Sequence, residues 1–74
     1  MTLRLENTSI HKVTKIVMLN KNGIYTILPH HISSIITGKL IAYYIDNEKK
    51  AIGYQGVLTI SQNYMEFIDN KNYY

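Results

Sequence analysis

The feature that most constrains the fold is a series of short segments rich in strand-forming residues, each followed by a polar turn. Ile, Val, Thr, Tyr and Phe make up 29 of the 74 residues (12, 3, 6, 7 and 1 of each), whereas alanine occurs only twice. Sheets favour β-branched and aromatic residues, and helices favour Ala, Leu, Glu and Gln. The sequence therefore predicts an all-β protein.

The segments with strand character recur with turns about every 8 to 12 residues, a spacing typical of a sandwich or barrel. We predict a small flattened β-sandwich or barrel of about 7 to 10 short antiparallel strands. A single domain is expected over residues 1–68, followed by a polar and aromatic tail, 69–74, that is flexible. The expected strands are Leu3–Leu5, Lys12–Leu19, Ile24–Leu28, Lys39–Ile45, Ala51–Tyr54, Val57–Ile60 and Tyr64–Ile68.

Turn residues separate these segments. Asn22-Gly23 suits the positive φ angles of a tight hairpin, and Pro29 is expected to end the strand after it. Asn63 ends the turn before the last strand. The other predicted turns are 7–9 and 46–49.

Three places are expected to depart from regular strands. Val13 and Ile16 differ in parity, which indicates a bulge or break near residues 14–15. Gly53 and Gly56 flank an expected kink. Residues 32, 35 and 36 are isoleucines whose spacing fits either one helical turn or an irregular buried loop.

The chain is short for a protein with no cysteine. A domain of this size buries about two-thirds of the surface that its unfolded chain exposes, and no disulfide or thiolate metal site can add stability. We therefore expect a thin core, built economically or covered in part by a partner.

The formal charge is +3, from eight basic and five acidic residues. Seven bases are scattered lysines and only Arg4 is an arginine, whereas nucleic-acid recognition favours arginine and a clustered basic face. We therefore expect no nucleic-acid partner. The positive charge together with Tyr43, Tyr44 and Tyr64 on strands keeps one alternative open, a small basic β-barrel nucleic-acid-binding module of the OB-like or Sm-like kind.

No set of residues converges on a catalytic or metal site in the sequence. The five carboxylates form no acid/base pair, and the nucleophile and phosphate-binding motifs are missing. Adjacent residues on a strand point to opposite faces, so we do not expect His30 and His31 to bind one zinc ion together. We expect a non-catalytic protein with no metal and no cofactor.

The longest apolar run, Leu40–Ile45, is far shorter than the about 20 residues that a bilayer requires. No apolar signal segment is visible at the N-terminus. The expectation is a soluble, cytosolic protein that could still dock on a membrane complex.

The order of three segments resembles the epsilon subunit of F-type ATP synthase. Residues 23–31, Gly-Ile-Tyr-Thr-Ile-Leu-Pro-His-His, are similar to the family segment G-x-x-x-(I/V)-L-P-x-H. Upstream, Val13, Ile16 and Met18 take the places of its V-x-x-V-x-L strand. Downstream, residues 55–68 follow its G-G-x-L-x-V-x-x-N-x-V-x-V-L segment without a gap.

The resemblance covers about residues 3–68, with departures. Gln55 replaces the first glycine of the family pair, Gly53 replaces an apolar strand residue, and Thr59 stands where an acidic residue is common. The segments before Val13 and after His31 are a few residues shorter than in the family.

The resemblance implies a non-catalytic rotor subunit of the central stalk. The family domain is a flattened β-sandwich that binds the gamma subunit on one side and the membrane-embedded c-ring on the other. The subunit would couple ion translocation to ATP synthesis as a peripheral part of the complex, on the cytoplasmic face of the inner or plasma membrane. The family's C-terminal helical hairpin, which inhibits hydrolysis in many relatives, has no counterpart here, so coupling without autoinhibition is expected.

By position, the turn Asn20, Lys21, Asn22, Gly23 and Ile24 resembles the loop that faces the c-ring. His31 matches the family histidine near gamma, and with His30 it forms the expected gamma-facing region. Structural turns are expected from the sequence pattern at Gly23, Pro29, Gly56 and Asn63. We also expect exposed apolar side chains near Ile24 and around His31.

Overall fold

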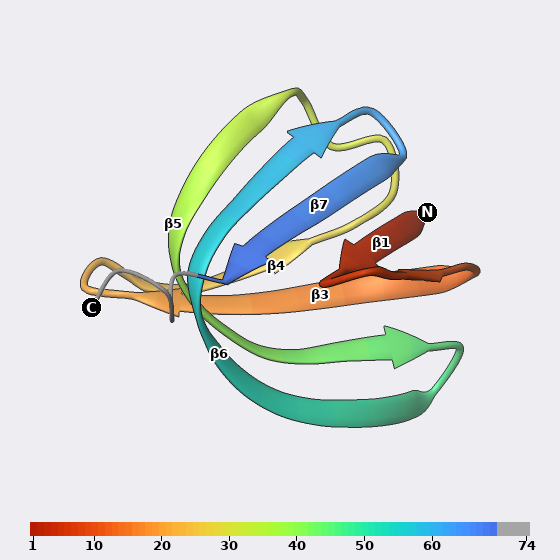
Figure 1. Cartoon of the computed structure of the whole chain (residues 1–74), viewed down its shortest axis with the longest axis horizontal. Coiled ribbons are helices and arrows are strands. Elements are labelled where there is room, and N and C mark those ends of the chain that lie inside the picture. Colours follow the sequence, from red (N-terminus) through yellow and green to blue (C-terminus); the bar gives the residue numbers. More distant parts are fainter. Residues whose placement is uncertain (70–74) are drawn as a thin grey trace.

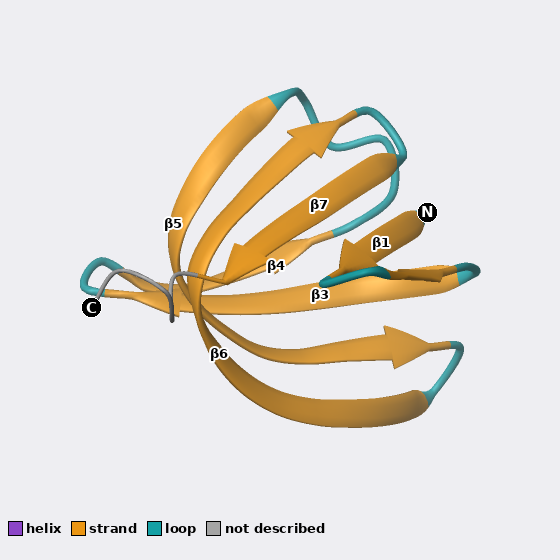
Figure 2. Cartoon of the chain, in the orientation of Figure 1, coloured by secondary structure: helices purple, strands orange, loops and turns teal. Residues whose placement is uncertain are grey.

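The computed structural model describes residues 1–69, which form seven strands and contain no helix. Short turns join most of the strands (Figure 2). The all-β prediction is confirmed. The strands are β1 (Thr2–Leu5), β2 (Thr8–Ile10), β3 (Val13–Asn20), β4 (Gly23–Ile27), β5 (Ser34–Ile45), β6 (Glu48–Ser61) and β7 (Tyr64–Asp69).

All seven strands belong to one sheet in the order β2-β1-β7-β6-β5-β3-β4. Five of the six strand pairs are antiparallel, as expected for hairpins. The pair of β1 and β7 is parallel, with Leu3 opposite Met65 and Leu5 opposite Phe67. The sheet is therefore mixed, because the first strand lies beside the last.

The sheet curls until its ends approach. Met1 donates to the Val13 carbonyl at 3.0 Å, and the Val13 N–H donates to the Met1 carbonyl at 2.9 Å. Lys12 lies between β2, which pairs with β1, and β3, which pairs with β5. Its φ of 61° bends the chain from one of these strands into the other. Because of this bend, the consecutive strands β2 and β3 connect the two ends of the curled sheet. Figure 1 shows β5 and β6 sweeping around the interior as two long curved strands.

The core fills the interior of this curve. Its fully buried side chains come from every strand except β2, whose Ile10 packs against them while partly exposed. Eleven hydrophobic residues are buried: Leu3, Val13, Ile16, Met18, Ile27, Leu40, Ala42, Leu58, Ile60, Met65 and Phe67.

Bulges in the strands change which side chains point into the core. The register shifts between Val13 and Lys15, so Val13 and Ile16 both point inward despite their different parity, as predicted. Two further shifts lie beside Ile41. On one side, Val17 pairs with Ala42 and Met18 with Leu40. On the other, Leu40 pairs with Tyr54 and Ala42 with Ala51, so β6 has one residue more than β5. The predicted kink near Gly53 is this irregularity, and β6 remains one strand where the sequence suggested two.

Two glycines face each other where β5 and β6 bend. Gly38 is opposite Gly56. A Cβ added to Gly56 would overlap the Ile68 carbonyl oxygen and lie 2.9 Å from Phe67 Cζ, and one added to Gly38 would lie 2.6 Å from the Leu19 carbonyl oxygen. The sheet can fold over here because both positions lack a side chain.

Other expectations require correction. The segment around Ile32 is neither a helical turn nor a buried loop, since β5 already begins at Ser34 and the side chains of Ile32 and Ile35 are 80% and 71% exposed. Part of the predicted turn 7–9 is strand β2. Asp69, assigned to the tail, is the last residue of β7. The rest of the predicted flexible tail, 70–74, lies outside the described residues.

Candidate functional site

The predicted turn at residues 20–24 is the tip of the β3–β4 hairpin, which projects from the body of the sheet (Figure 1). Asn20 and Gly23 form its last pair, so Lys21 and Asn22 make a two-residue loop. The Asn22 N–H donates to Asn20 Oδ1 at 2.8 Å, a local bond typical of asparagine turns. Gly23 has a φ of +123°, whereas Asn22 keeps a negative φ, so only the glycine uses the left-handed region.

Ile24 follows directly in β4 and is 66% exposed. It stands opposite Leu19 of β3, which is 40% exposed, so the two side chains form an apolar pair near the tip. The expectation of an exposed apolar side chain at Ile24 is confirmed. Ile24 lies in a strand, although the sequence placed it in the turn.

The segment with the two histidines follows β4. Pro29 and His30 form a turn, in which His30 has a φ of 65°. The His30 N–H donates to Asn63 Oδ1 at 2.8 Å, and Asn63 Nδ2 lies 3.3 Å from His30 Nδ1. His31 is half-buried, and its Nδ1 lies 2.8 Å from the carbonyl oxygen of Ile32. Asn63, in the turn between β6 and β7, thus holds the loop in place.

The two histidines differ in their surroundings, and within residues 1–69 no group of three His, Cys, Asp or Glu residues is placed to hold a metal ion. Each histidine has a nearby backbone or amide partner that fits an ordinary loop role. What the loop contacts in a complex remains a prediction from the resemblance.

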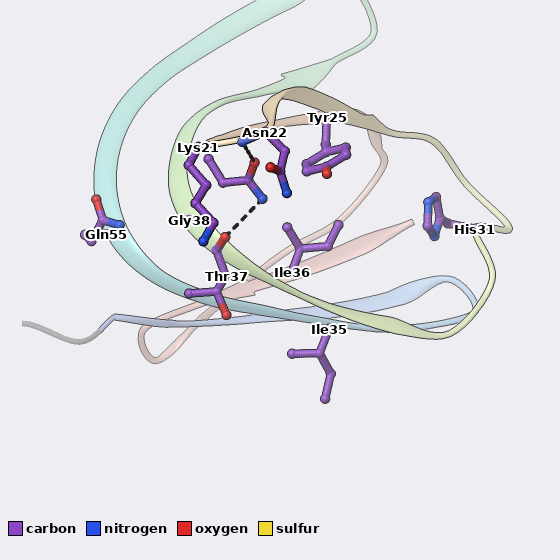
Figure 3. A pocket seen from close by; sticks show the side chains of 10 residues that line it. Lys21, Asn22, Tyr25, His31, Ile35, Ile36, Thr37, Gly38 and Gln55 are labelled. Carbon is purple, nitrogen blue, oxygen red and sulfur yellow. Dashed lines mark hydrogen bonds between the residues drawn. The ribbon is translucent and has the colours of Figure 1, made fainter.

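A cleft connects the two predicted regions. Its volume is about 670 Å³, and it opens between the β3–β4 hairpin tip and the first half of β5 (Figure 3). It brings three of the hairpin residues together with His31, while Ile24, Gly23 and His30 lie outside its lining. The lining residues are Asn20, Lys21, Asn22, Tyr25, His31, Ile35, Ile36, Thr37, Gly38 and Gln55.

Six of these lining residues did not stand out in the sequence as site residues: Tyr25, Ile35, Ile36, Thr37, Gly38 and Gln55. They join the hairpin through contacts between distant segments, such as Asn20 Nδ2 donating to the Thr37 carbonyl at 3.5 Å. Gly38 was the one available signal, because a glycine inside a strand often marks a close backbone approach.

The lining of the cleft contains one lysine, Lys21, and no acidic residue. The chain contains no Asp or Glu between Glu6 and Asp46, a stretch that includes Lys12, Lys15, Lys21 and Lys39. None of the ten lining residues is acidic. The cleft therefore combines the apolar surface of Tyr25, Ile35 and Ile36 with polar side chains and the positive charge of Lys21.

Comparison with known proteins supplies no relative: no protein-family model matches the chain, and neither curated proteins nor solved structures give a significant match. Among the described residues, no helix has the length and apolar character needed to cross a membrane.

Proposed function

We propose that this chain is a non-catalytic central-stalk subunit of a rotary F-type ATP synthase, which docks between the gamma subunit and the c-ring. In this role it transmits rotation, and so couples ion translocation to ATP synthesis, without binding a cofactor. Its place is peripheral, at the cytoplasmic face of the membrane that holds the complex. The proposal starts from the order of the three sequence segments that resemble the epsilon subunit.

The observation that carries the proposal is the distribution of exposed apolar side chains. Eight large hydrophobic residues are exposed among those described. Six of the eight fall between residues 19 and 35, the stretch that contains the G-x-x-x-I-L-P-x-H segment: Leu19, Ile24, Tyr25, Leu28, Ile32 and Ile35. Leu19 and Ile24 are paired near the hairpin tip, and Leu28 and Ile32 lie on either side of His30, so exposed apolar side chains stand at both ends of β4. Contiguous exposed apolar side chains mark an interaction surface more often than scattered ones do.

The geometry also supports two separate contacts. The hairpin tip and the histidine loop lie at opposite ends of β4, whose five residues span roughly 17 Å at about 3.3 Å per residue. The tip carries Lys21 and Ile24, and the loop carries Leu28 and Ile32, which are 53% and 80% exposed. A domain that links two partners requires such a separation.

The proposal is tested by co-purification. The tagged full chain is expressed in its own cells, and membranes are solubilised and captured through the tag. We expect gamma and the c-ring to be recovered with it. Recovery of RNA without any ATPase subunit would instead support the basic nucleic-acid-binding alternative and overturn the proposal.

Two variants sharpen the test. Ile24→Asp places a charge at the proposed c-ring contact and is expected to lower recovery of the c-ring. Ile68→Asp makes the same change at a position 51% exposed on β7, outside the hairpin and the loop, and is the matched control. Equal loss of the c-ring in both variants would argue against a specific contact at the hairpin.

A further inference from the structure

The first half of β5 has an edge without a partner strand. Residues 34–38 pair with β6 on one side. On the other side, the pairing with β3 begins only at Lys39, because β3 ends in the hairpin at Asn20. The exposed edge faces the cleft, which Ile35, Ile36 and Thr37 line.

Backbone groups on this edge point into the cleft. Asn20 Nδ2 donates to the Thr37 carbonyl from this side, so Thr37 is a residue whose polar groups face away from β6. The backbone N–H and C=O groups of successive residues in an antiparallel strand point to alternate sides. Those of Ile35, two residues before Thr37, therefore also face away from β6. Within residues 1–69, no backbone hydrogen bond outside the ladders involves Ile35. A strand edge of this kind is a template for a further strand.

The side chains around the edge suit an extended peptide. Ile35 and Ile36 point to opposite sides of β5, and Ile36 is directed toward Tyr25 and Asn22 (Figure 3). Ile35 is 71% exposed and Ile36 is half-buried. An added strand would alternate in the same way, with one face on Ile36 and Tyr25 and the other beside Ile35.

The charge of the cleft indicates which kind of peptide would bind there. Lys21 lines the cleft, Lys39 follows Gly38 in β5, and none of the lining residues is acidic. The nearest acidic residues across the sheet, Glu66 and Asp69, are on β7, which β6 separates from β5, and Glu66 Oε2 lies 3.7 Å from Arg4 Nε. An acidic segment would therefore meet complementary charge at Lys21.

We propose that this cleft binds an extended acidic segment of a partner protein, which adds to the edge of residues 34–37 as an antiparallel or parallel strand. Lys21 pairs with a carboxylate of that segment, and Ile36 and Tyr25 contact its apolar side chains. The cleft volume of about 670 Å³ lies within the usual range for binding pockets, about 300 to 1,000 Å³. A peptide fits better than a nucleic acid because the edge offers backbone donors and acceptors that another backbone matches. The inference goes beyond the rotor assignment and does not require it.

The test uses the isolated full chain and a short capped peptide of alternating valine and glutamate. Backbone amide NMR signals are followed during titration, and affinity is measured by fluorescence anisotropy. We expect shifts centred on Ile35 and Thr37. We also expect Lys21→Glu to weaken binding about tenfold, since a charged hydrogen bond is typically worth a decade or more in affinity. Lys49→Glu, on an exposed lysine of β6 outside the cleft lining, is the matched control and should bind as the parent does.

A second pair of peptides separates strand addition from simple charge attraction. The same peptide with N-methylated backbone amides keeps its charge but cannot pair, so it should not bind. A valine–lysine peptide should not bind either. Equal binding of the methylated peptide, shifts confined to other residues, or tighter binding of a uridine oligonucleotide at Ile35 and Thr37 would each overturn the inference. None of these outcomes bears on recovery of gamma or the c-ring, so the two proposals fail separately.

Discussion

Asn63 holds His30 across 33 positions of chain: the His30 N–H donates to Asn63 Oδ1 at 2.8 Å. The acceptor lies in the turn between β6 and β7, and the donor lies in the loop that follows β4. His30 has a φ of 65°, a strained conformation for a non-glycine residue. One side chain thus ties this loop to the turn between β6 and β7.

Asn63→Ala should release this loop. Loss of the acceptor leaves the His30 N–H to water and should cost about 1 kcal/mol of unfolding free energy. Amide hydrogen exchange in residues 28–33 should accelerate more than elsewhere. Asn63→Asp keeps the acceptor oxygen and should retain slow exchange, and Asn47→Ala, in the exposed β5–β6 turn, is the matched control. Unchanged exchange in Asn63→Ala would show that the loop is held by other contacts.

Gly56→Ala should be strongly destabilising. Its Cβ would overlap the Ile68 carbonyl oxygen and crowd the Phe67 ring, and overpacking of this kind costs about 1 to 3 kcal/mol. Gly53→Ala is the control in the same strand, because its Cβ would meet only Lys39 Cε, at 3.5 Å. Urea denaturation of both variants measures the difference. Equal stabilities would mean that the bend of β6 can relax around an added methyl group.

Ile24→Asp should leave folding almost unchanged, because this side chain is 66% exposed. Ile27→Asp, three positions along the same strand, should abolish the folded state, because Ile27 is 0% exposed and an unpaired charge would enter the core. Thermal unfolding followed by circular dichroism distinguishes the two. A loss of cooperative melting in Ile24→Asp would place this residue in the core and remove it from the proposed contact.

Glu48 and Lys50 should shift each other's pKa in opposite directions. Lys50 Nζ lies 2.8 Å from Glu48 Oε1, and this hydrogen bond, with the attraction of opposite charges, lowers the pKa of Glu48 and raises the pKa of Lys50. Any stability from Glu48 is present at neutral pH and is lost as pH falls through its lowered folded pKa. The contribution of Lys50 is lost as pH rises through its raised folded pKa.

The effect on stability should be small, because the pair is exposed to solvent. Lys50→Met should return the pKa of Glu48 toward its ordinary value, as measured by NMR titration of its carboxyl carbon. Lys49→Met is the control. No change in the Glu48 titration would show that the pair does not persist in solution.

Local patterns were sufficient for most of the strands. The alternation around Leu3, the parity change at Val13 and Ile16, and the turn before Gly23 each follow from contacts within a few residues. They predicted an all-β fold, whereas the exposed Ile24 was expected from the resemblance to the family loop. That residues 48–61 form one continuous strand, β6, could not be predicted. Gly53 and Gly56 indicate a break in the local sequence, whereas pairing with β5 and β7 keeps the strand continuous.

The cleft was beyond the reach of local patterns. Its lining joins the hairpin to the start of β5, and the isoleucine spacing there was equally compatible with a helical turn. Ile32, next to His31, is exposed as expected for the region around His31, whereas the alternative of a buried loop is wrong for both Ile32 and Ile35. Exposure of this kind depends on where β3 ends relative to β5, which is a property of the whole sheet.

The parallel pairing of β1 with β7 has a consequence for synthesis. Thr2 pairs with Tyr64, 62 positions later in the chain. At a synthesis rate of about 5 to 20 residues per second, Tyr64 of β7 is added about 3 to 12 seconds after Thr2 of β1. Until then Leu3, fully buried in the finished protein, has no partner from β7. The fold closes only when translation has passed Phe67, and the nascent chain exposes an unfinished sheet during that time.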